Sequence, residues 1–283
     1  MAVGYLGTAV KDEQQAVDRL SIFLLGLGWS IAQDVTDTGS DRDIVFSSPG
    51  EPDVPNGLTR YIRLRGTSNA IALHTYETFV DTGTNTGEVT DATYGKITTE
   101  GDAQGFSLMA VADLERVVIQ VETYNEVRYI GYVGRINSYY TAQQFNQPNL
   151  VKGGQATTYD WYYSAAERNS WMRAPEGTQA HYYAIEPVDS TGLTAGQTSD
   201  RNGSMFLSAP VLVRVDADTN KSELVGEPRG VYRLSPEVSQ NQMFLTIDED
   251  TYVVFNSNSK SWAVGPVAVS GTGAPSLFSD LTG

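Results

Sequence analysis

Apolar side chains recur at helical spacing in one part of the chain, close to its N-terminus. These residues are Val10, Val17, Leu20, Phe23, Leu24 and Leu27. Steps of three, four and seven residues are typical of an amphipathic helix. Thr8 is the predicted N-cap of this helix, and Gly26 and Gly28 are expected to end it.

From Trp29 onward the pattern changes to short runs in which apolar and polar side chains mostly alternate. The runs are Trp29 to Gln33, Asp43 to Phe46, Tyr61 to Arg65 and Ala70 to Val80. Alternation with a period of two predicts half-buried strands, so this part should form a sheet that the helix can cover. The next segment, Asp81 to Gly105, is rich in Asp, Thr, Gly and Asn, which predicts a long exposed loop.

Three further runs predict a meander of antiparallel strands. They are Phe106 to Ala112, Arg116 to Glu122 and Val127 to Ile136, with a turn at Asp113 and Leu114. The segment from Asn137 to Thr158 contains Pro148, Gly153 and Gly154, and it is expected to leave the sheet as an irregular connector.

More strand-like runs follow the connector and complete the predicted organisation. They are Met205 to Leu207, Val211 to Val215, Gly230 to Leu234, Met243 to Ile247 and Thr251 to Phe255. The predicted fold is mainly β, with antiparallel sheets or a sandwich, one N-terminal amphipathic helix and long loops. Residues 1–150 are expected to form a helix-plus-sheet domain. Residues 151–269 form a second β-rich region, either separate or packed into the same domain, and residues 270–283 form a flexible C-terminal arm.

Charge and composition narrow the classes of function. The formal net charge of −15 argues against a general nucleic-acid binder, which needs clustered Lys and Arg, although DNA could pass nearby. Cysteine is absent, which excludes disulfides and thiolate metal sites and is compatible with assembly in a host cytoplasm. The N-terminus lacks the pattern of a secretory signal, and the longest apolar run is too short to span a bilayer, so no membrane partner is expected.

The search for chemistry identifies no catalytic, cofactor-binding or metal-binding residues, and the chain is not expected to be an enzyme. His74 and His181 are the two histidines, and lone histidines are mostly structural. Asp34, Asp37, Asp41 and Asp43 crowd one segment, where a solvated acidic turn is favoured over a pair of catalytic carboxylates. Residues 216–227 match part of a calcium loop, but Lys221 occupies the position that requires Gly, and the flanks predict a hairpin.

Three groups of residues are candidates for contacts between subunits. Arg63 and Arg65 share one face of a predicted strand and could pair with the acidic segments, with a neighbouring subunit or with solvent; pairing with a neighbouring subunit is preferred. The second group comprises Trp161, Tyr162 and Trp171 in an aromatic-rich stretch, where packing within the domain competes with a binding surface. The third comprises Leu277, Phe278 and Leu281 in the C-terminal arm, which is expected to dock on another chain.

Two segments resemble a known family. The run Ser107 to Arg135, with its short turn, β-branched strand and Tyr-Ile-Gly strand, looks like the central segment of tailed-bacteriophage virion structural proteins. In that family a connector with Pro and Gly-Gly follows, as at Pro148 to Gly154 here. Leu224 to Ser235, followed by Asp250 to Asn256, is similar to the C-terminal pattern of the same family.

The resemblance implies a structural subunit of a tailed-virus particle, in the neck, collar or head-to-tail connection. Such a subunit would assemble with copies of itself in a ring and with neighbouring connector, tail or sheath proteins, and its location would be the virion. The first alternative is a tail or baseplate structural protein. The second is a carbohydrate-binding receptor module that uses the aromatic residues. A hydrolase ranks last.

Overall fold

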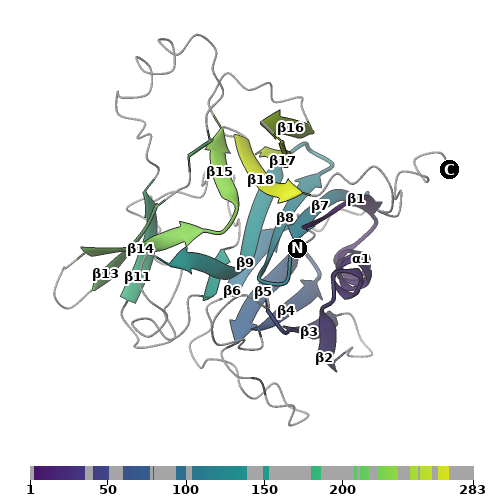
Figure 1. Ribbon diagram of the computed structural model, residues 1–283. Helices are drawn as coiled ribbons and strands as arrows, with labels where there is room; N and C mark the ends of the chain where they lie inside the picture. The colour runs from purple at the N-terminus through teal and green to yellow at the C-terminus, as the bar shows by residue number, and fades with distance from the viewer. Residues whose placement is uncertain are drawn as a thin grey trace.

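A computed structural model shows the fold that this sequence adopts. The structure describes residues 3–35, 41–50, 60–76, 79, 94–99, 104–138, 149–152, 180–185, 207–208, 211–216, 222–234, 243–247, 249–256 and 261–267. Within these residues the chain is mainly β, with antiparallel sheets and one helix near the N-terminus, as the sequence predicts (Figure 1).

The first sheet contains eight strands and forms the middle of the molecule. Its order is β1-β7-β8-β9-β14-β13-β11, and β10 pairs with β9. The strands are β1 (Gly4–Val10), β7 (Phe106–Ala112), β8 (Arg116–Thr123), β9 (Arg128–Ser138), β10 (Asn149–Lys152), β11 (Ala180–Ile185), β13 (Val211–Asp216) and β14 (Ser222–Pro228). All of the pairings are antiparallel. The meander of β7, β8 and β9 confirms the three strands predicted between residues 106 and 136.

Two five-stranded sheets accompany the first sheet. The second sheet has the order β2-β3-β4-β5-β6, and the third has the order β12-β15-β18-β17-β16. The second comprises β2 (Ser30–Asp34), β3 (Arg42–Ser48), β4 (Arg60–Thr67), β5 (Ala70–Tyr76) and β6 (Tyr94–Thr98). The third comprises β12 (Leu207–Ser208), β15 (Val231–Leu234), β16 (Phe244–Ile247), β17 (Asp250–Asn256) and β18 (Ser261–Val267). The helix α1 (Glu13–Gly26) packs on the second sheet and on β1.

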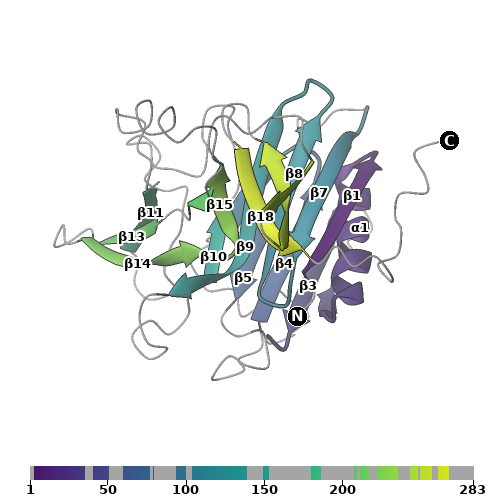
Figure 2. The same ribbon diagram turned by 45° about the horizontal axis from the view of Figure 1, so that its top comes forward.

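The three sheets form layers, and among the described residues two of the three apolar clusters lie between them. Figure 2 shows β18 in front of β7 and β8, with β3 and β4 behind them. One face of the first sheet packs against α1 and the second sheet, through residues such as Leu108 and Ile119. The opposite face packs against the third sheet, through residues such as Val111 and Val118. Because β7 and β8 are buried on both faces, each contains a continuous apolar run, Leu108 to Ala112 and Val117 to Ile119, instead of a strict alternation.

The helix begins later than the sequence pattern predicted. Residues 4–10 form β1, so Thr8 lies in a strand and is not the N-cap. Asp12 is the N-cap: its backbone is extended and its side chain accepts a 2.7 Å hydrogen bond from the Gln15 N–H. Gln15 Oε1 in turn accepts from the Lys11 N–H at 2.8 Å. Two local hydrogen bonds therefore fix the start of α1, as in a capping box.

Two segments predicted as irregular contain strands. The expected loop from residue 81 to 105 includes β6, which pairs with β5 and buries Ile97, so this part of the prediction is wrong. The connector expected to leave the sheet contains β10, which returns to pair with β9. The predicted division at residue 150 falls inside β10, and β14 from the second region hydrogen-bonds to β9 from the first.

Candidate functional site

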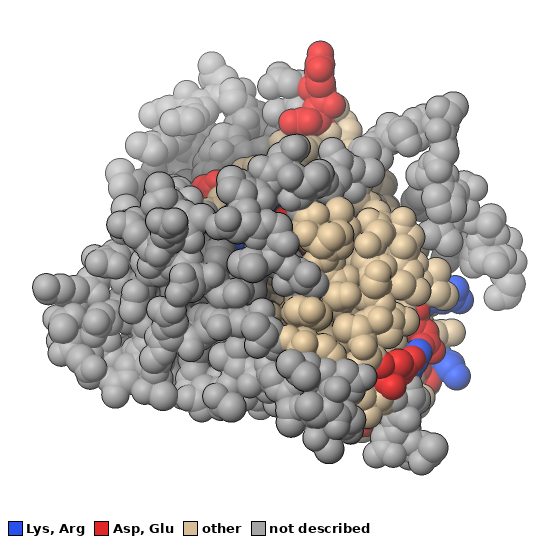
Figure 3. All heavy atoms as spheres, turned by 60° about the horizontal axis from the view of Figure 1, so that its bottom comes forward, with Lys and Arg blue, Asp and Glu red and all other residues tan. Residues whose placement is uncertain are grey.

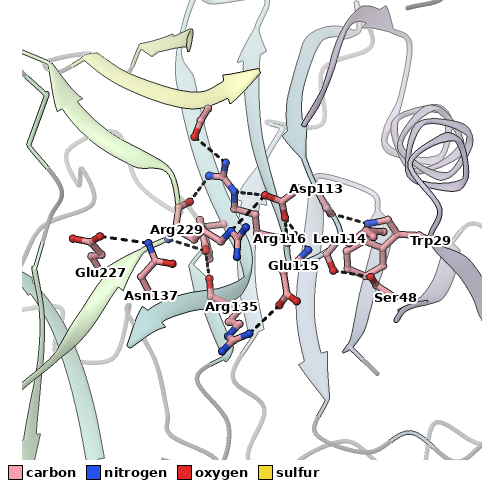
Figure 4. A network of polar contacts seen from close by, with 12 residues as sticks. Trp29, Ser48, Asp113, Leu114, Glu115, Arg116, Arg135, Asn137, Glu227 and Arg229 are labelled. Atoms are coloured by element: carbon pink, nitrogen blue, oxygen red, sulfur yellow. Dashed lines mark hydrogen bonds and ion pairs between the residues drawn. The ribbon is translucent and has the colours of Figure 1, made fainter. Parts of the chain in front are cut away.

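A buried group of charged residues lies at the turn between β7 and β8, where the three sheets meet (Figure 4). At its centre is Asp113, the residue after β7. Oδ1 of Asp113 accepts hydrogen bonds from the N–H groups of Glu115, at 2.7 Å, and Arg116, at 3.0 Å. Oδ2 accepts from Nε of Arg116 at 3.1 Å. One carboxylate thus closes the turn and binds the first side chain of β8. We call the group formed by Asp113, Glu115, Arg116, Arg135 and Arg229 the arginine junction.

Arg116 extends the arginine junction to the third sheet. Its side chain is only 1% exposed, although it carries a full positive charge. Nη1 donates to the carbonyl of Arg229, before β15, and Nη2 donates to the carbonyl of Gly265, in β18, at 3.2 Å. A buried guanidinium is tolerated when its charge is paired and its N–H groups are bonded, and Arg116 meets both conditions.

Two further arginines surround the same turn. Arg229 places Nε 3.7 Å from Asp113 Oδ2. Arg135, at the end of the β8–β9 pairing, places Nη1 3.8 Å from Glu115 Oε2, and its N–H donates to the carbonyl of Glu115 at 2.9 Å. Three guanidinium groups therefore lie beside two carboxylates, and backbone carbonyl oxygens are the other hydrogen-bond acceptors of the group.

Tyr132 connects two of these arginines through their backbones. Its hydroxyl donates to the carbonyl of Arg135 and accepts from the N–H of Arg229 at 3.2 Å. Complete burial raises the pKa of Tyr132 above its ordinary value, with Arg116 opposing the shift. The neutral hydroxyl can therefore donate and accept at once, which ties β9 to the segment before β15. Beside it, Nδ2 of Asn137 donates to Oε1 of Glu227 at 3.4 Å.

The second sheet and the helix end reach the same turn from the other side. Nε1 of Trp29, which follows α1, donates to the carbonyl of Asp113 at 2.9 Å. Oγ of Ser48, at the end of β3, donates to the carbonyl of Leu114 at 2.6 Å. Figure 4 shows these two contacts on one side of the turn and the contacts of Arg116 and Arg229 on the other. The turn is thus bound by groups from all three layers.

Two glycines leave room for Arg116. Gly134 has φ +142°, and a Cβ there would lie 2.7 Å from Cβ of Arg116. Gly230 has φ +56°, and a Cβ there would lie 2.5 Å from Nη2 of Arg116. Both the backbone conformation and the space require glycine at these two positions. The arginine junction therefore depends on residues that carry no side chain of their own.

A second charged group lies on the face of the second sheet that is turned away from the first sheet. Arg63 in β4 is 4% exposed; its Nε lies 2.7 Å from Asp43 Oδ1, and its Nη2 lies 2.5 Å from Asp43 Oδ2. The bidentate hydrogen bond to Asp43 is the main cause that raises the pKa of Arg63. Arg65 is half-buried and donates from Nη2 to Asp41 Oδ2 at 2.5 Å.

These contacts decide between the alternatives for Arg63, whereas for Arg65, whose side chain is 42% exposed, an additional contact with a neighbouring subunit stays a prediction. Both side chains pair with the acidic segment of their own chain. For Arg63 the preferred prediction, an ion pair with a neighbouring subunit, is wrong because its buried guanidinium is already bound by Asp43. Asp43 is likewise buried in β3 and does not belong to a solvated turn. Asp37 lies outside the described residues.

His74 lies in β5, directly opposite Arg63 in β4. Burial, helped by the positive charge of Arg63, lowers the pKa of His74 to about 4. The imidazole is therefore neutral at physiological pH. The neutral imidazole of His74 lies beside Arg63, whose charge is already paired. This arrangement suits packing of the sheet face better than acid–base chemistry near pH 7.

Several predicted residues cannot be placed. Trp161, Tyr162, Trp171, Leu277, Phe278 and Leu281 lie outside the described residues. His181 belongs to β11, where the backbone pairing is described and the side chain is not. The segment that partly matched a calcium loop contains a hairpin, but its second strand is β14 and not the predicted strand at residues 230–234, which is β15 and pairs with β12 and β18. Residues 217–221, between β13 and β14, lie outside the described part.

Two searches of the described residues gave negative results. No three His, Cys, Asp or Glu side chains in this part of the chain converge as metal ligands would. Its single helix is neither long nor apolar enough to cross a membrane.

Sequence reasoning found the turn at residues 113–114 but not the arginine junction around it. The available signal was the placement of Asp113, Glu115 and Arg116 between two almost wholly apolar strands, because charges in that setting must be paired. The partners of Arg116 are backbone carbonyls, which every residue has, so the sequence could not indicate them.

Comparison with known proteins places the chain in no described group, since no family model and no curated protein matches it.

Proposed function

We propose that this chain is a structural subunit of a tailed-virus particle, placed in the neck, collar or head-to-tail connection. The observation that carries the proposal is the arginine junction. Asp113, Arg116 and Arg135 come from the first segment that resembles the virion family, and Arg229 and Gly230 come from the second. Two segments that are far apart in sequence thus form one buried unit.

That unit suits a mechanical role. The side chains at its centre bind one another and the backbone, and together they hold three antiparallel sheets at fixed positions. A subunit that transmits force between the head and the tail needs such a rigid frame, and its loops and sheet edges remain for contacts. In this proposal the partners are copies of the same chain in a ring and neighbouring connector, tail or sheath proteins. The virion is the location.

The proposal is tested by producing the full chain and measuring its mass in solution, followed by electron microscopy of any assembly. Ring-shaped oligomers support the proposal. A chain that stays monomeric up to about 100 μM, where any contact with a Kd well below that concentration would be populated, contradicts the self-assembly that the proposal requires.

Two parallel measurements address the other classes. Selective binding on a glycan array would replace the proposal with a carbohydrate-binding receptor module, and turnover in a hydrolase screen would replace it with an enzyme. If rings form, imaging of complete particles with an antibody to the chain separates a neck position from a tail or baseplate position.

A further inference from the structure

Large apolar side chains are exposed at few places on the described part of the molecule, and five of the six gather on two faces. They are Ile22, Leu25, Ile31, Met243 and Phe244, and the sixth is Tyr124. Exposed apolar groups of this kind often mark contacts with other proteins.

The first face is formed by α1 and β2. Ile22, which is 67% exposed, and Leu25 lie one turn apart on the outer side of α1. Ile31 lies on β2, the edge strand of the second sheet. Arg42 joins the two elements, because it binds Asp18 of α1 and Asp34 of β2. These ion pairs hold α1 and β2 side by side, and we call the surface that carries Ile22, Leu25 and Ile31 the helix face.

The second face lies at the start of β16, the edge strand of the third sheet. It contains Met243 and Phe244, and the ring of Phe244 packs edge-on against Tyr5 of β1 with centroids 5.3 Å apart. We call it the β16 face. Tyr5 packs toward the core of the third sheet, whereas Leu6 packs toward the core beneath α1. The two faces thus lie on different sides of β1.

The charges that make no ion pair beside the two faces are opposite in sign, whereas Asp18 and Asp34 at the helix face are already paired with Arg42. Arg19 is exposed one turn before Ile22 and makes no ion pair within the described residues. Glu249 and Asp250 are exposed where β16 turns into β17, and within the same described part they also make no ion pair. Figure 3 shows a broad area of uncharged side chains, with acidic groups alone at its top and a mixed acidic and basic group at its right.

We propose that the helix face of one copy of this chain binds the β16 face of a second copy. Ile22, Leu25 and Ile31 would then pack against Met243 and Phe244, and Arg19 would meet the carboxylates of Glu249 and Asp250. A second copy is the occupant because the two faces match in apolar character and complement each other in charge. Contact between two helix faces would offer Arg19 no carboxylate that is free of an ion pair, because Asp18 and Asp34 are bound by Arg42. Contact between two β16 faces would bring carboxylates together.

Through this pairing, copies of the proposed subunit can form a closed ring. Each copy has one face of each kind, so a closed ring of two or more copies leaves neither face open. The inference rests on the proposed function, because it names the contact through which copies assemble. The chain has a net charge of −15, so a local attraction between opposite charges is needed to bring copies together.

The test uses two full-length variants that each damage one face. Ile22→Glu alters the helix face, and Met243→Glu alters the β16 face; both side chains are exposed, so folding should be retained. Tyr124→Glu is the matched control, because Tyr124 is 64% exposed and belongs to neither face. Circular dichroism and thermal unfolding check that each variant is folded.

We expect each face variant alone to associate at least about tenfold more weakly than wild type, as measured by analytical ultracentrifugation, and the control to behave as wild type. An equimolar mixture of the two variants should regain association, because one intact helix face then meets one intact β16 face. Wild-type-like assembly of either variant overturns the pairing. A mixture that stays as weak as the separate variants also overturns it.

A charge exchange tests the orientation. Arg19→Glu should weaken association and Asp250→Arg should do the same, whereas the chain that carries both changes should recover most of it. Failure of the double variant to recover overturns the assigned pairing of charges.

Failure of this inference can be told apart from failure of the proposed function. If wild type assembles while both face variants assemble equally well, the pairing is wrong and the proposed function stands. If wild type does not assemble, both are contradicted.

Discussion

Gly230 lies directly against the guanidinium of Arg116, so close that a Cβ on the glycine would come within 2.5 Å of Nη2. A residue with no side chain therefore leaves the space that the buried guanidinium of Arg116 occupies. Gly230 also accepts a 3.0 Å hydrogen bond from the Gly265 N–H, so its backbone and that of β18 are tied together next to Arg116.

Replacing Gly230 should destabilise the fold. Gly230→Ala forces an alanine to φ +56° and into Arg116, so we expect a loss of about 2 to 4 kcal/mol in the free energy of unfolding, measured with denaturant. Gly26→Ala is the control, because nothing lies within 4 Å of a Cβ there and helical alanine is favoured. A Gly230→Ala protein as stable as the control would show that the segment can move away from Arg116.

Removing the charge of Arg116 should be more damaging than removing an exposed arginine. Arg116→Met removes the guanidinium nearest to the buried Asp113, leaving Arg229 at 3.7 Å, and leaves two carbonyls without a donor, which should lower the free energy of unfolding by about 3 to 5 kcal/mol. Arg128 pairs with Glu122 where both side chains are partly exposed, so Arg128→Met should change it by about 1 kcal/mol or less. Equal effects of the two changes would contradict the role assigned to the arginine junction.

The neutral state of His74 should appear as a pH dependence of stability. The pKa is 6.5 for an ordinary histidine and about 4 for His74 in the folded chain. The unfolded chain therefore takes up the proton first as the pH falls, and the folded chain loses stability between about pH 6.5 and pH 4. The full loss is on the order of 3 kcal/mol.

His74→Gln removes the titrating group, so its stability should fall less steeply than that of wild type over the same pH range. Urea unfolding at several pH values measures both slopes. The same comparison with His181→Gln shows how much the other histidine contributes. Parallel slopes for wild type and His74→Gln would mean that the folded pKa of His74 is close to its ordinary value.

The C-terminal arm is expected to serve assembly more than the stability of the single subunit. Deleting residues 270–283, or changing Leu277, Phe278 and Leu281 to Ser in the full chain, should weaken association while thermal unfolding of the subunit changes little. Mass measurements across a concentration series and a thermal melt check the two effects. Unchanged assembly together with a large drop in melting temperature would place these side chains in the core of their own chain.

The strands of the meander could be predicted because each apolar run ends at clear turn residues, such as Asp113 and Asn125. β6 was missed because Ile97, the β6 residue whose burial the structure describes, stands in a stretch that is mostly polar in sequence. β14 and β18 were missed because Gly and Pro interrupt them, as at Pro228 and Pro266. Edge position, as in β6, and local irregularity, as in β14 and β18, weaken the alternation of apolar and polar residues on which sequence reasoning depends.

The start of the helix shows a second reason why an element boundary could not be predicted from the sequence. Val10 fits the helical spacing, yet it lies in β1 and is buried beneath the helix. Spacing alone cannot tell whether an apolar residue belongs to the helix or to the strand before it. The local hydrogen bonds of Asp12 and Gln15 decide the boundary, and they depend on the side-chain geometry of two residues.

The partners of Arg116 have a consequence for synthesis on the ribosome. The Arg229 and Gly265 carbonyls follow it in the chain by 113 and 149 residues. While the later part is still untranslated, the paired charge of Asp113 and Arg116 lacks these acceptors, and the side of the first sheet that carries Val111 and Val118 lacks its cover. Folding of the first sheet can therefore be completed only near the end of translation, and prematurely terminated chains should be prone to aggregation.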